Sequence, residues 1–299
     1  MIQIPEAFAR GTAAREGRRG RDWIAALPGL VDEFLQRWDC TPTGAILHGQ
    51  VGIVVPVRCS DVPSAVLKIS FPHPGNVHEP DAFAAWGGRG AVALYERDDT
   101  SFAMLLERAE RGSLADVADV DEAVAIAGRL AHRLAVPAPV GLPRLRDQMG
   151  QWEEELRKDA AHLADSSLQR EVEAALATFR ELGSEQLDTL VHGDLHYGNV
   201  LRAEREPWLA VDPKGYVGDV AYDAITLLRN RHQELLAAAD LKSALLRRLA
   251  IFADAAGADP DRARRWAQAR AVTDSLRGRR LGDPAWVIQL NDRIAGLLS

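Results

Sequence analysis

The order of strand-like and helix-like segments limits how this chain can fold more than any other feature. Between about residues 43 and 107, short runs of apolar and β-branched residues alternate with turn residues, whereas helical spacing dominates after residue 113. Strands followed by helices are typical of an α+β architecture. We predict a five-stranded antiparallel sheet with one helix in residues 1–107 and a helix-rich lobe in residues 108–299. The expected strands are 45–48, 52–58, 65–69, 91–96 and 102–106, and the expected helix is 79–86.

The N-terminus is expected to have two parts. Residues 1–19 are polar and aperiodic, which predicts a loose arm, and residues 20–38 carry apolar residues at helical spacing. Pro28 should kink or split that helix. In the second lobe, strand-like texture returns only at 189–212, and helices are expected again from 219 to the end.

Composition excludes several classes of protein. A chain of 299 residues with 47% hydrophobic and 26% charged residues is typical of a soluble globular protein, as one two-lobed unit or two domains. The sequence lacks the roughly 20 apolar residues that a membrane helix needs, and it begins without a secretory signal. Cys40 and Cys59 are too few for a zinc cage or a disulfide framework. We therefore expect a cytoplasmic protein with no membrane partner, for which a monomer is plausible.

The net charge of −7 indicates what kind of ligand to expect. It argues against nucleic acid as the main ligand and is compatible with a cationic small molecule.

The stretch His192-Gly193-Asp194-Leu195-His196-Tyr197-Gly198-Asn199 carries the strongest chemical signal. Asp212 follows 13 residues later, at the end of an apolar run. Phosphoryl transfer needs an acceptor for the hydroxyl proton and oxygen ligands for Mg²⁺. Asp194 is the candidate proton acceptor, and Asn199 and Asp212 are the candidate metal ligands. Two other interpretations are a polar capped turn and a metallohydrolase cluster of His192, Asp194 and His196.

This stretch resembles the catalytic loop of the aminoglycoside phosphotransferases, which share the protein-kinase-like fold. The runs 210–215, 218–219 and 222–223, with Asp-Pro-Lys-Gly at 212–215, look like the streptomycin 6-kinase and hydroxyurea phosphotransferase branch. Residues 21–28 and 85–90 are also similar to that branch. The resemblance implies ATP and Mg²⁺ as cofactors and a hydroxylated, cationic small molecule of the streptomycin type as acceptor.

Lys68 lies in the otherwise apolar run 65–69, where a buried lysine needs a charged partner. In the kinase-like fold this lysine contacts the α- and β-phosphates and pairs with a glutamate of the next helix. Glu79 is our candidate, with Asp81 or Glu96 as alternatives. An edge-strand lysine that reaches solvent is the other interpretation.

Two further segments are expected to contact nucleotide. Gly49 and Gly52 lie in a turn whose backbone N–H groups could approach phosphate oxygens, although a plain hairpin turn has the same pattern. By resemblance, backbone groups near Glu107 and Ala109 would bind adenine.

The weakest candidates are acidic residues that could face the acceptor. Asp219 is mainly a helix N-cap candidate, and Asp223 either orients the catalytic loop or touches substrate. Glu154 and Asp159, with their acidic neighbours, fit a cationic sugar or simply a solvated helix face. Asp274 and Asp283 in the last helices could also line the acceptor site. The alternative acceptors are hydroxyurea, a sugar or amino sugar, and another hydroxylated metabolite. The alternative of another class is a nucleotide-binding pseudokinase that serves as a regulatory module.

Overall fold

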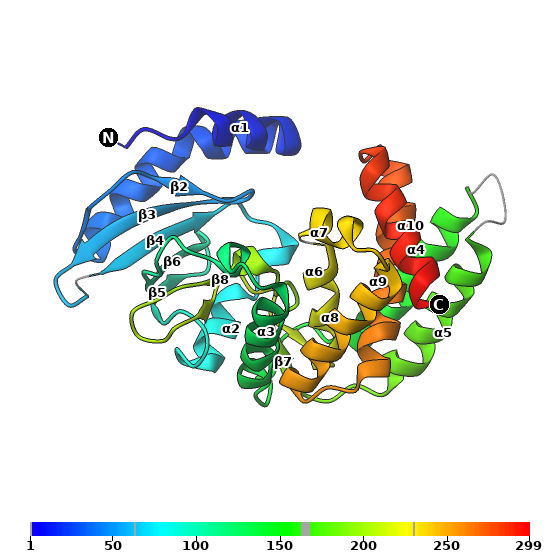
Figure 1. Ribbon diagram of the computed structural model, residues 1–299. Helices are drawn as coiled ribbons and strands as arrows, with labels where there is room; N and C mark the ends of the chain where they lie inside the picture. Colours follow the sequence, from blue (N-terminus) through cyan, green and yellow to red (C-terminus); the bar gives the residue numbers. More distant parts are fainter. Residues whose placement is uncertain (1, 63, 163–167, 230) are drawn as a thin grey trace. The chain divides into compact units, whose positions relative to one another are not determined.

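The computed structural model describes residues 2–62, 64–162, 168–229 and 231–299 (Figure 1). The chain divides into two compact units, the first of Met1–Arg111 with Arg202–Lys214 and the second of Gly112–Leu201 with Gly215–Ser299. The sequence predicted one boundary near residue 107. The segment 202–214 returns to the first unit because Ala210 bridges Ala91 and Arg202 O accepts a hydrogen bond from Glu110 N.

The first unit is built on an antiparallel sheet whose described part has six strands rather than the predicted five. The strand order is β1-β3-β4-β6-β5, and β2 also pairs with β3. The additional strand is β1, which the sequence did not indicate because it is only three residues long. The bounds are β1 Cys40–Pro42, β2 Leu47–His48, β3 Gly52–Cys59, β4 Ala65–Ser70, β5 Leu94–Asp98 and β6 Ala103–Glu107. The short helix α2 (Glu79–Trp86) lies where it was predicted.

Helix α1 (Glu6–Arg37) overturns the expectation of a loose arm at residues 1–19. Its backbone departs from helical geometry at Gly17, with φ +62° and ψ −130°, so α1 consists of two helical arms set at an angle (Figure 1). The break therefore lies at Gly17, which tolerates this conformation because it has no Cβ. Pro28, where a kink was expected, lies inside the second arm.

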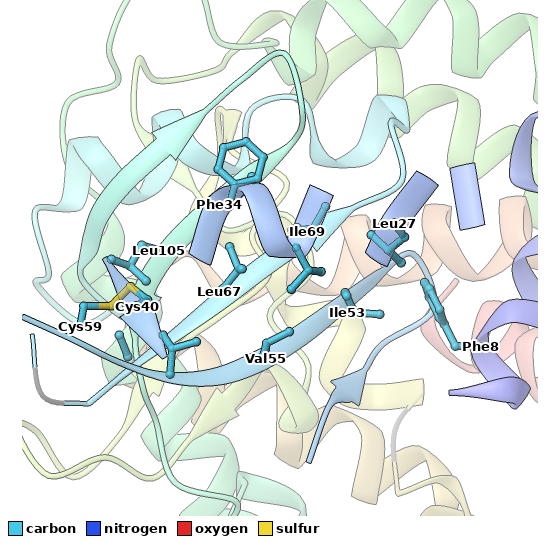
Figure 2. Close-up of a cluster of buried hydrophobic side chains, with 14 residues drawn as sticks. Phe8, Leu27, Phe34, Cys40, Ile53, Val55, Cys59, Leu67, Ile69 and Leu105 are labelled. Carbon is cyan, nitrogen blue, oxygen red and sulfur yellow. A yellow bond between two sulfur atoms is a disulfide. The ribbon is translucent and has the colours of Figure 1, made fainter. Parts of the chain in front are cut away.

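The second arm of α1 covers one face of the sheet (Figure 2). Its spacing of three and four residues places Leu27, Val31 and Phe34 on one side, and all three are fully buried. In β4 the alternation of a pleated strand sends Leu67 and Ile69 to this core, so Lys68 faces the opposite side of the sheet. Burial of this apolar face fixes the register of β4.

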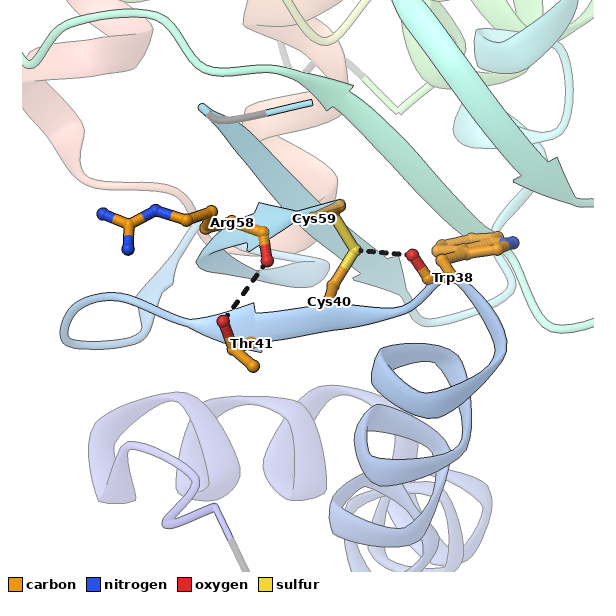
Figure 3. The surroundings of a disulfide bond; sticks show 5 residues. All are labelled: Trp38, Cys40, Thr41, Arg58 and Cys59. Atoms are coloured by element: carbon orange, nitrogen blue, oxygen red, sulfur yellow. Dashed lines mark hydrogen bonds between the residues drawn. A yellow bond between two sulfur atoms is a disulfide. The ribbon is translucent and has the colours of Figure 1, made fainter. Parts of the chain in front are cut away.

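The two cysteines, too few for a disulfide framework, are nevertheless joined by one disulfide (Figure 3). Cys40 and Cys59 are direct partners in the β1–β3 ladder, with Cα atoms 4.1 Å apart. The disulfide links β1 covalently to the longest strand of the sheet. The Sγ atom of Cys40 also lies 3.1 Å from the carbonyl oxygen of Trp38.

The second unit is mainly helical. Its apolar stripes pack α3 on α8, and α9 on both α5 and α10. The short strands β7 (Leu190–Val191) and β10 (Tyr216–Val217) pair antiparallel. In the described residues, no helix is long and apolar enough to cross a membrane. The helix bounds are α3 Val120–Leu134, α4 Leu145–Ala160, α5 Gln169–Ser184, α6 Ala224–Arg229, α7 His232–Ala237, α8 Leu241–Ala256, α9 Pro260–Leu281 and α10 Ala285–Leu298.

Candidate active site

In the first unit, Lys68 joins two carboxylates. Its Nζ lies 2.5 Å from Glu79 Oε1 and 2.7 Å from Asp212 Oδ1. Glu79, the first residue of α2, is buried, whereas 38% of the Asp212 side chain is exposed. The structure thus pairs Lys68 with Glu79, rather than with the alternatives Asp81 or Glu96, and excludes the edge-strand interpretation.

The charge of Lys68 is held by its partners. Burial alone lowers the pKa of this amine, but the adjacent carboxylates of Glu79 and Asp212 outweigh burial and raise the pKa above its ordinary value. Lys68 therefore remains protonated at neutral pH. A protonated amine beside a partly exposed carboxylate is suited to binding a phosphate or a metal-bound phosphate.

The backbone at Asp212 is strained. Its φ is +58°, in the left-handed region that residues other than glycine seldom adopt. Such strain persists where surrounding contacts enforce it and is frequent at functional sites. Lys214 Nζ lies 3.9 Å from Asp212 Oδ2, so a second amine is close to this carboxylate.

The two glycines of the turn 48–52 differ in role. A Cβ at Gly52 would lie 2.7 Å from Ser70 Oγ and 2.9 Å from the carbonyl oxygen of Ile69, so the close approach of β3 to β4 requires glycine there. A Cβ at Gly49 would meet no atom within 4 Å, and Gly49 N donates to Gly52 O at 3.0 Å. Close packing therefore requires glycine at position 52, whereas no packing contact of the described residues requires glycine at position 49.

The segment expected to bind adenine begins at the end of β6. The carboxylate of Glu107 is held by Arg205 at 2.8 Å and accepts a hydrogen bond from Ala93 N at 3.0 Å. Glu107 N donates to Ala93 O. These bonds anchor the strand end, and Ala109 follows two residues later.

In the second unit, the loop from His192 to Asn199 is fixed by a buried carboxylate. Asp223 Oδ2 accepts from His192 N at 3.1 Å, and Asp223 Oδ1 accepts from Gly193 N at 2.8 Å. Gly193 has φ +82°, so the turn into Asp194 needs a residue without a Cβ. Asp223 therefore fixes the backbone of the loop that carries Asp194, and its predicted role in orienting a catalytic loop or touching substrate stays a prediction.

The other end of the loop is fixed through Asn199. Its Nδ2 donates a hydrogen bond of 3.0 Å to the carbonyl oxygen of Asp194. This bond uses the nitrogen of the amide and not Oδ1, which is the atom that a metal ion would bind. Nδ1 of His192 accepts from Asp194 N, and Nδ1 of His196 accepts from Gly198 N. The histidines thus serve as turn caps, which disfavours the metallohydrolase interpretation.

A charged network near Asp194 contains Asp274, a predicted acceptor residue, together with Arg270 and Tyr222, for which no role was predicted. Arg270 of α9 donates to the Tyr222 hydroxyl and lies 3.4 Å from Asp274 Oδ2. The Tyr222 oxygen and the carboxylates of Asp274 and Asp194 raise the pKa of Arg270. Trp152 stacks on Tyr222 with ring centroids 5.9 Å apart. The i,i+4 spacing of Arg270 and Asp274 was visible in the sequence, but the contact with Tyr222 was not.

Three of the other acidic candidates, Glu154, Asp159 and Asp219, have structural partners. Glu154 pairs with Lys158 at 2.7 Å on an exposed helix face, and Asp159 pairs with Arg280 at 2.8 Å. Asp219 caps the 3-10 turn Val220–Asp223 through Ala221 N and accepts from Arg262 and Trp266 with its other oxygen. These bonds favour structural roles, and contact of the three residues with an acceptor stays a prediction.

The environment of Asp223 leads to a prediction about stability. Burial raises the pKa of Asp223 to about 7, whereas an Asp side chain in the unfolded chain has a pKa of about 4. Between these values the folded chain binds more protons, so its free energy of unfolding should fall as pH rises, by up to about 1.4 kcal/mol per pH unit. Denaturant titrations at several pH values should show that Asp223→Asn loses this part of the slope. Identical slopes in both proteins would contradict the assignment.

Each unit, taken by itself, holds groups of the kind that phosphoryl transfer uses. One unit holds a protonated lysine beside the strained, partly exposed Asp212. The other holds Asp194 on a loop whose backbone is fixed at both ends, with the acceptor oxygen of Asn199 nearby. Such fixed groups serve a reaction in which positioning and charge neutralisation account for most of the catalysis.

Comparisons with known proteins agree with this chemistry. The family model for aminoglycoside/hydroxyurea antibiotic resistance kinases matches residues 37–282. The streptomycin 6-kinase of Streptomyces glaucescens is 39% identical over 92% of this chain and 91% of the relative. The hydroxyurea phosphotransferase of Kitasatospora aureofaciens is 36% identical over 92% of this chain and 80% of the relative.

Solved structures establish the fold alone. A choline/ethanolamine kinase family protein from Mesorhizobium loti matches with a TM-score of 0.62 at 15% identity, over 90% of this chain and 95% of that chain. The likeness supports the protein-kinase-like α+β fold that the sequence predicted. By sequence, the chain belongs to the aminoglycoside/hydroxyurea antibiotic resistance kinase family and is a phosphotransferase.

Proposed function

We propose that this enzyme transfers the γ-phosphate of ATP, in a Mg²⁺-dependent reaction, to a hydroxyl group of a streptomycin-type aminoglycoside. The observation that carries the proposal is the fixed loop that presents Asp194, together with 39% identity to a streptomycin 6-kinase. A cytoplasmic location is part of the proposal, because ATP is the donor.

Asp194 accepts or orients the proton of the attacking hydroxyl. The bonds from Asp223 to the backbone and from Asn199 to the Asp194 carbonyl hold this carboxylate in place before substrate binds. Preorganisation of this kind removes an ordering cost from the chemical step. Neither bond uses the carboxylate of Asp194 itself.

Asn199 and Asp212 supply the oxygens for Mg²⁺. The fit is chemical: an amide oxygen and a partly exposed carboxylate are hard ligands, and Mg²⁺ needs only one or two protein oxygens besides phosphate and water. When bound, the ion neutralises charge on the phosphates. Lys68, held protonated by Glu79, neutralises the phosphates that are not transferred. The main-chain groups of the turn 48–52 and of the segment near Ala109 bind the remainder of the nucleotide.

The acceptor is a cation in this proposal. Streptomycin carries two guanidinium groups, and a guanidinium pairs with a carboxylate through two parallel hydrogen bonds. Asp274 is our candidate partner because Asp274 and Asp194 both raise the pKa of Arg270, so the two carboxylates lie near the same guanidinium. Hydroxyurea is the second candidate, since a relative with 36% identity is a hydroxyurea phosphotransferase.

The role of Asp274 can be tested by acceptor kinetics. A hydrogen bond to a charged group contributes roughly 1.5–3 kcal/mol, and 1.4 kcal/mol is tenfold, so Asp274→Asn should raise the streptomycin KM by roughly 10- to 100-fold. The ATP KM should stay nearly unchanged. Glu154→Gln is the matched control, because Glu154 lies on an exposed helix face and forms an ion pair with Lys158, four residues along the same helix.

The identity of the acceptor can be tested by comparing three candidate acceptors in one assay. A coupled assay of ADP release with streptomycin, hydroxyurea and glucosamine should give the highest kcat/KM with streptomycin. If hydroxyurea is preferred and Asp274→Asn has no effect, the acceptor assignment is wrong but the kinase assignment stands. If ATP stabilises the protein but no ADP forms with any of the three acceptors, the result supports the pseudokinase interpretation.

A further inference from the structure

The first arm of α1 folds back onto the second. A Cβ at Gly20 would lie only 2.6 Å from the carbonyl oxygen of Thr12, although eight residues of a straight helix span about 12 Å. The reversal takes place at Gly17, and the close contact requires glycine at position 20. Thr12 is completely buried. The two arms are therefore a packed pair rather than a frayed end.

The folded-back arm reaches the turn 48–52. The ring of Phe8, which is 3% exposed, lies 5.4 Å from the ring of His48. Nη2 of Arg15 donates a hydrogen bond of 2.8 Å to the carbonyl oxygen of Gln50. A ring contact near the start of the first arm and a charge-assisted hydrogen bond near its end thus connect the arm to this turn.

The second arm supports the same turn from the segment after β4. Trp23 packs edge-on against Phe71 at 5.6 Å, and the guanidinium of Arg19 lies over the Phe71 ring at 5.7 Å. Phe71 N donates to the carbonyl oxygen of Val51 at 2.7 Å. Two consecutive carbonyl groups, those of Gln50 and Val51, are therefore held by contacts that depend on α1.

A glycine-bearing hairpin turn without such support samples many conformations, and binding a phosphate would have to order it. Contacts that already hold the turn reduce this cost and improve affinity. The family match begins at residue 37, so the arm lies outside the matched segment.

We propose that the first arm of α1, residues 6–16, is a brace that positions the turn 48–52 for the phosphates of the nucleotide, with Arg15 as its positioning residue. This inference rests on the proposed function, because it takes the turn to be the phosphate-covering segment. The brace increases the affinity for nucleotide and does not affect the affinity for the acceptor.

The test compares Arg15→Gln with Arg18→Gln. Arg18 is a matched control because it lies on the same helix, 88% exposed, and contacts only Asp22 at 3.7 Å among the ion pairs of the described residues. Amide hydrogen exchange of residues 48–52 reports the turn directly, and titration with a non-hydrolysable ATP analogue reports affinity without any phosphotransfer. Phe8→Leu is a second variant that keeps an apolar side chain but removes the ring.

We expect Arg15→Gln to speed exchange at residues 48–52 and to weaken binding of the analogue by roughly three- to tenfold, the effect of losing one partly exposed charged hydrogen bond. Acceptor KM and melting temperature should change little, and Arg18→Gln should match the wild type. Faster exchange with unchanged nucleotide affinity would contradict the proposal that the arm is a brace for the nucleotide. Unchanged exchange in both Arg15→Gln and Phe8→Leu would also contradict it. Failure of the proposed function is distinguishable, because it appears as absent phosphotransfer in the wild type.

Discussion

Replacing Asp194 with asparagine should lower turnover by roughly 10²–10⁴-fold, the range of a general-base contribution. The amide has nearly the shape of the carboxylate but cannot accept a proton from the attacking hydroxyl. The loop should keep its conformation, because its bonds to Asp223 and Asn199 use the backbone of His192, Gly193 and Asp194. Single-turnover kinetics at saturating ATP and acceptor would measure the chemical step.

Nucleotide binding is the control for this variant. Because Asp194 is assigned to the hydroxyl and not to ATP, thermal stabilisation by ATP should be nearly the same in wild type and variant. A turnover within threefold of wild type would remove Asp194 from the mechanism. Loss of ATP binding together with turnover would mean that the substitution had disturbed the loop.

The second large effect is expected at Asp212. Asp212→Ala should abolish Mg²⁺-dependent turnover, since the variant loses the carboxylate assigned to the metal and a partner of Lys68. The first unit should still fold, because Lys68 keeps its 2.5 Å pair with the buried Glu79. The additional thermal stabilisation that Mg²⁺ gives over ATP alone should be lost as well.

Asp212→Asn is the matched comparison for this variant. The amide keeps an oxygen and the shape of the side chain but loses the charge, so it should retain part of the Mg²⁺ effect. Unchanged dependence on Mg²⁺ in Asp212→Ala would show that the ion is held elsewhere. A requirement for Zn²⁺ in place of Mg²⁺ would favour the hydrolase interpretation.

Local patterns carried most of what the sequence could predict. The lysine in the otherwise apolar run 65–69 indicated a buried charge that needs a partner, and the next helix supplied Glu79, 11 residues later. The helix α2 and the strands β3, β4 and β6 were expected within a residue or two of their observed bounds. Each of these depends on interactions between near neighbours, which periodicity reports.

Long-range contacts could not be predicted in the same way. Asp223 binds the backbone of His192 across 31 residues, and Arg270 binds Tyr222 across 48. The reversal of α1 depends on one positive φ at Gly17, in a segment whose polar composition resembles a loose arm. The disulfide requires the β1–β3 register, which a strand of three residues does not reveal. Only packing in three dimensions decides these features.

Charge in the sequence was also a poor guide to the acceptor site. Glu154 and Asp159 were candidates because they are acidic, yet each is paired with a nearby or packed cation. Pairing at i,i+4 is the usual arrangement of an exposed helix face. Asp274 is also paired at i,i+4, with Arg270, but its side chain is 14% exposed against 67% for Glu154. The structure also shows that the pKa of Arg270 responds to Asp194, which the sequence could not reveal.

The central claim is that this chain phosphorylates a streptomycin-type aminoglycoside. The most direct test incubates the purified full-length protein with γ-labelled ATP, Mg²⁺ and streptomycin, and then identifies the labelled product by mass spectrometry. We expect streptomycin that has gained one phosphoryl group, formed in step with ADP and absent with Asp194→Asn. Label released only as inorganic phosphate, or transferred to hydroxyurea but not to streptomycin in parallel reactions, would contradict the claim.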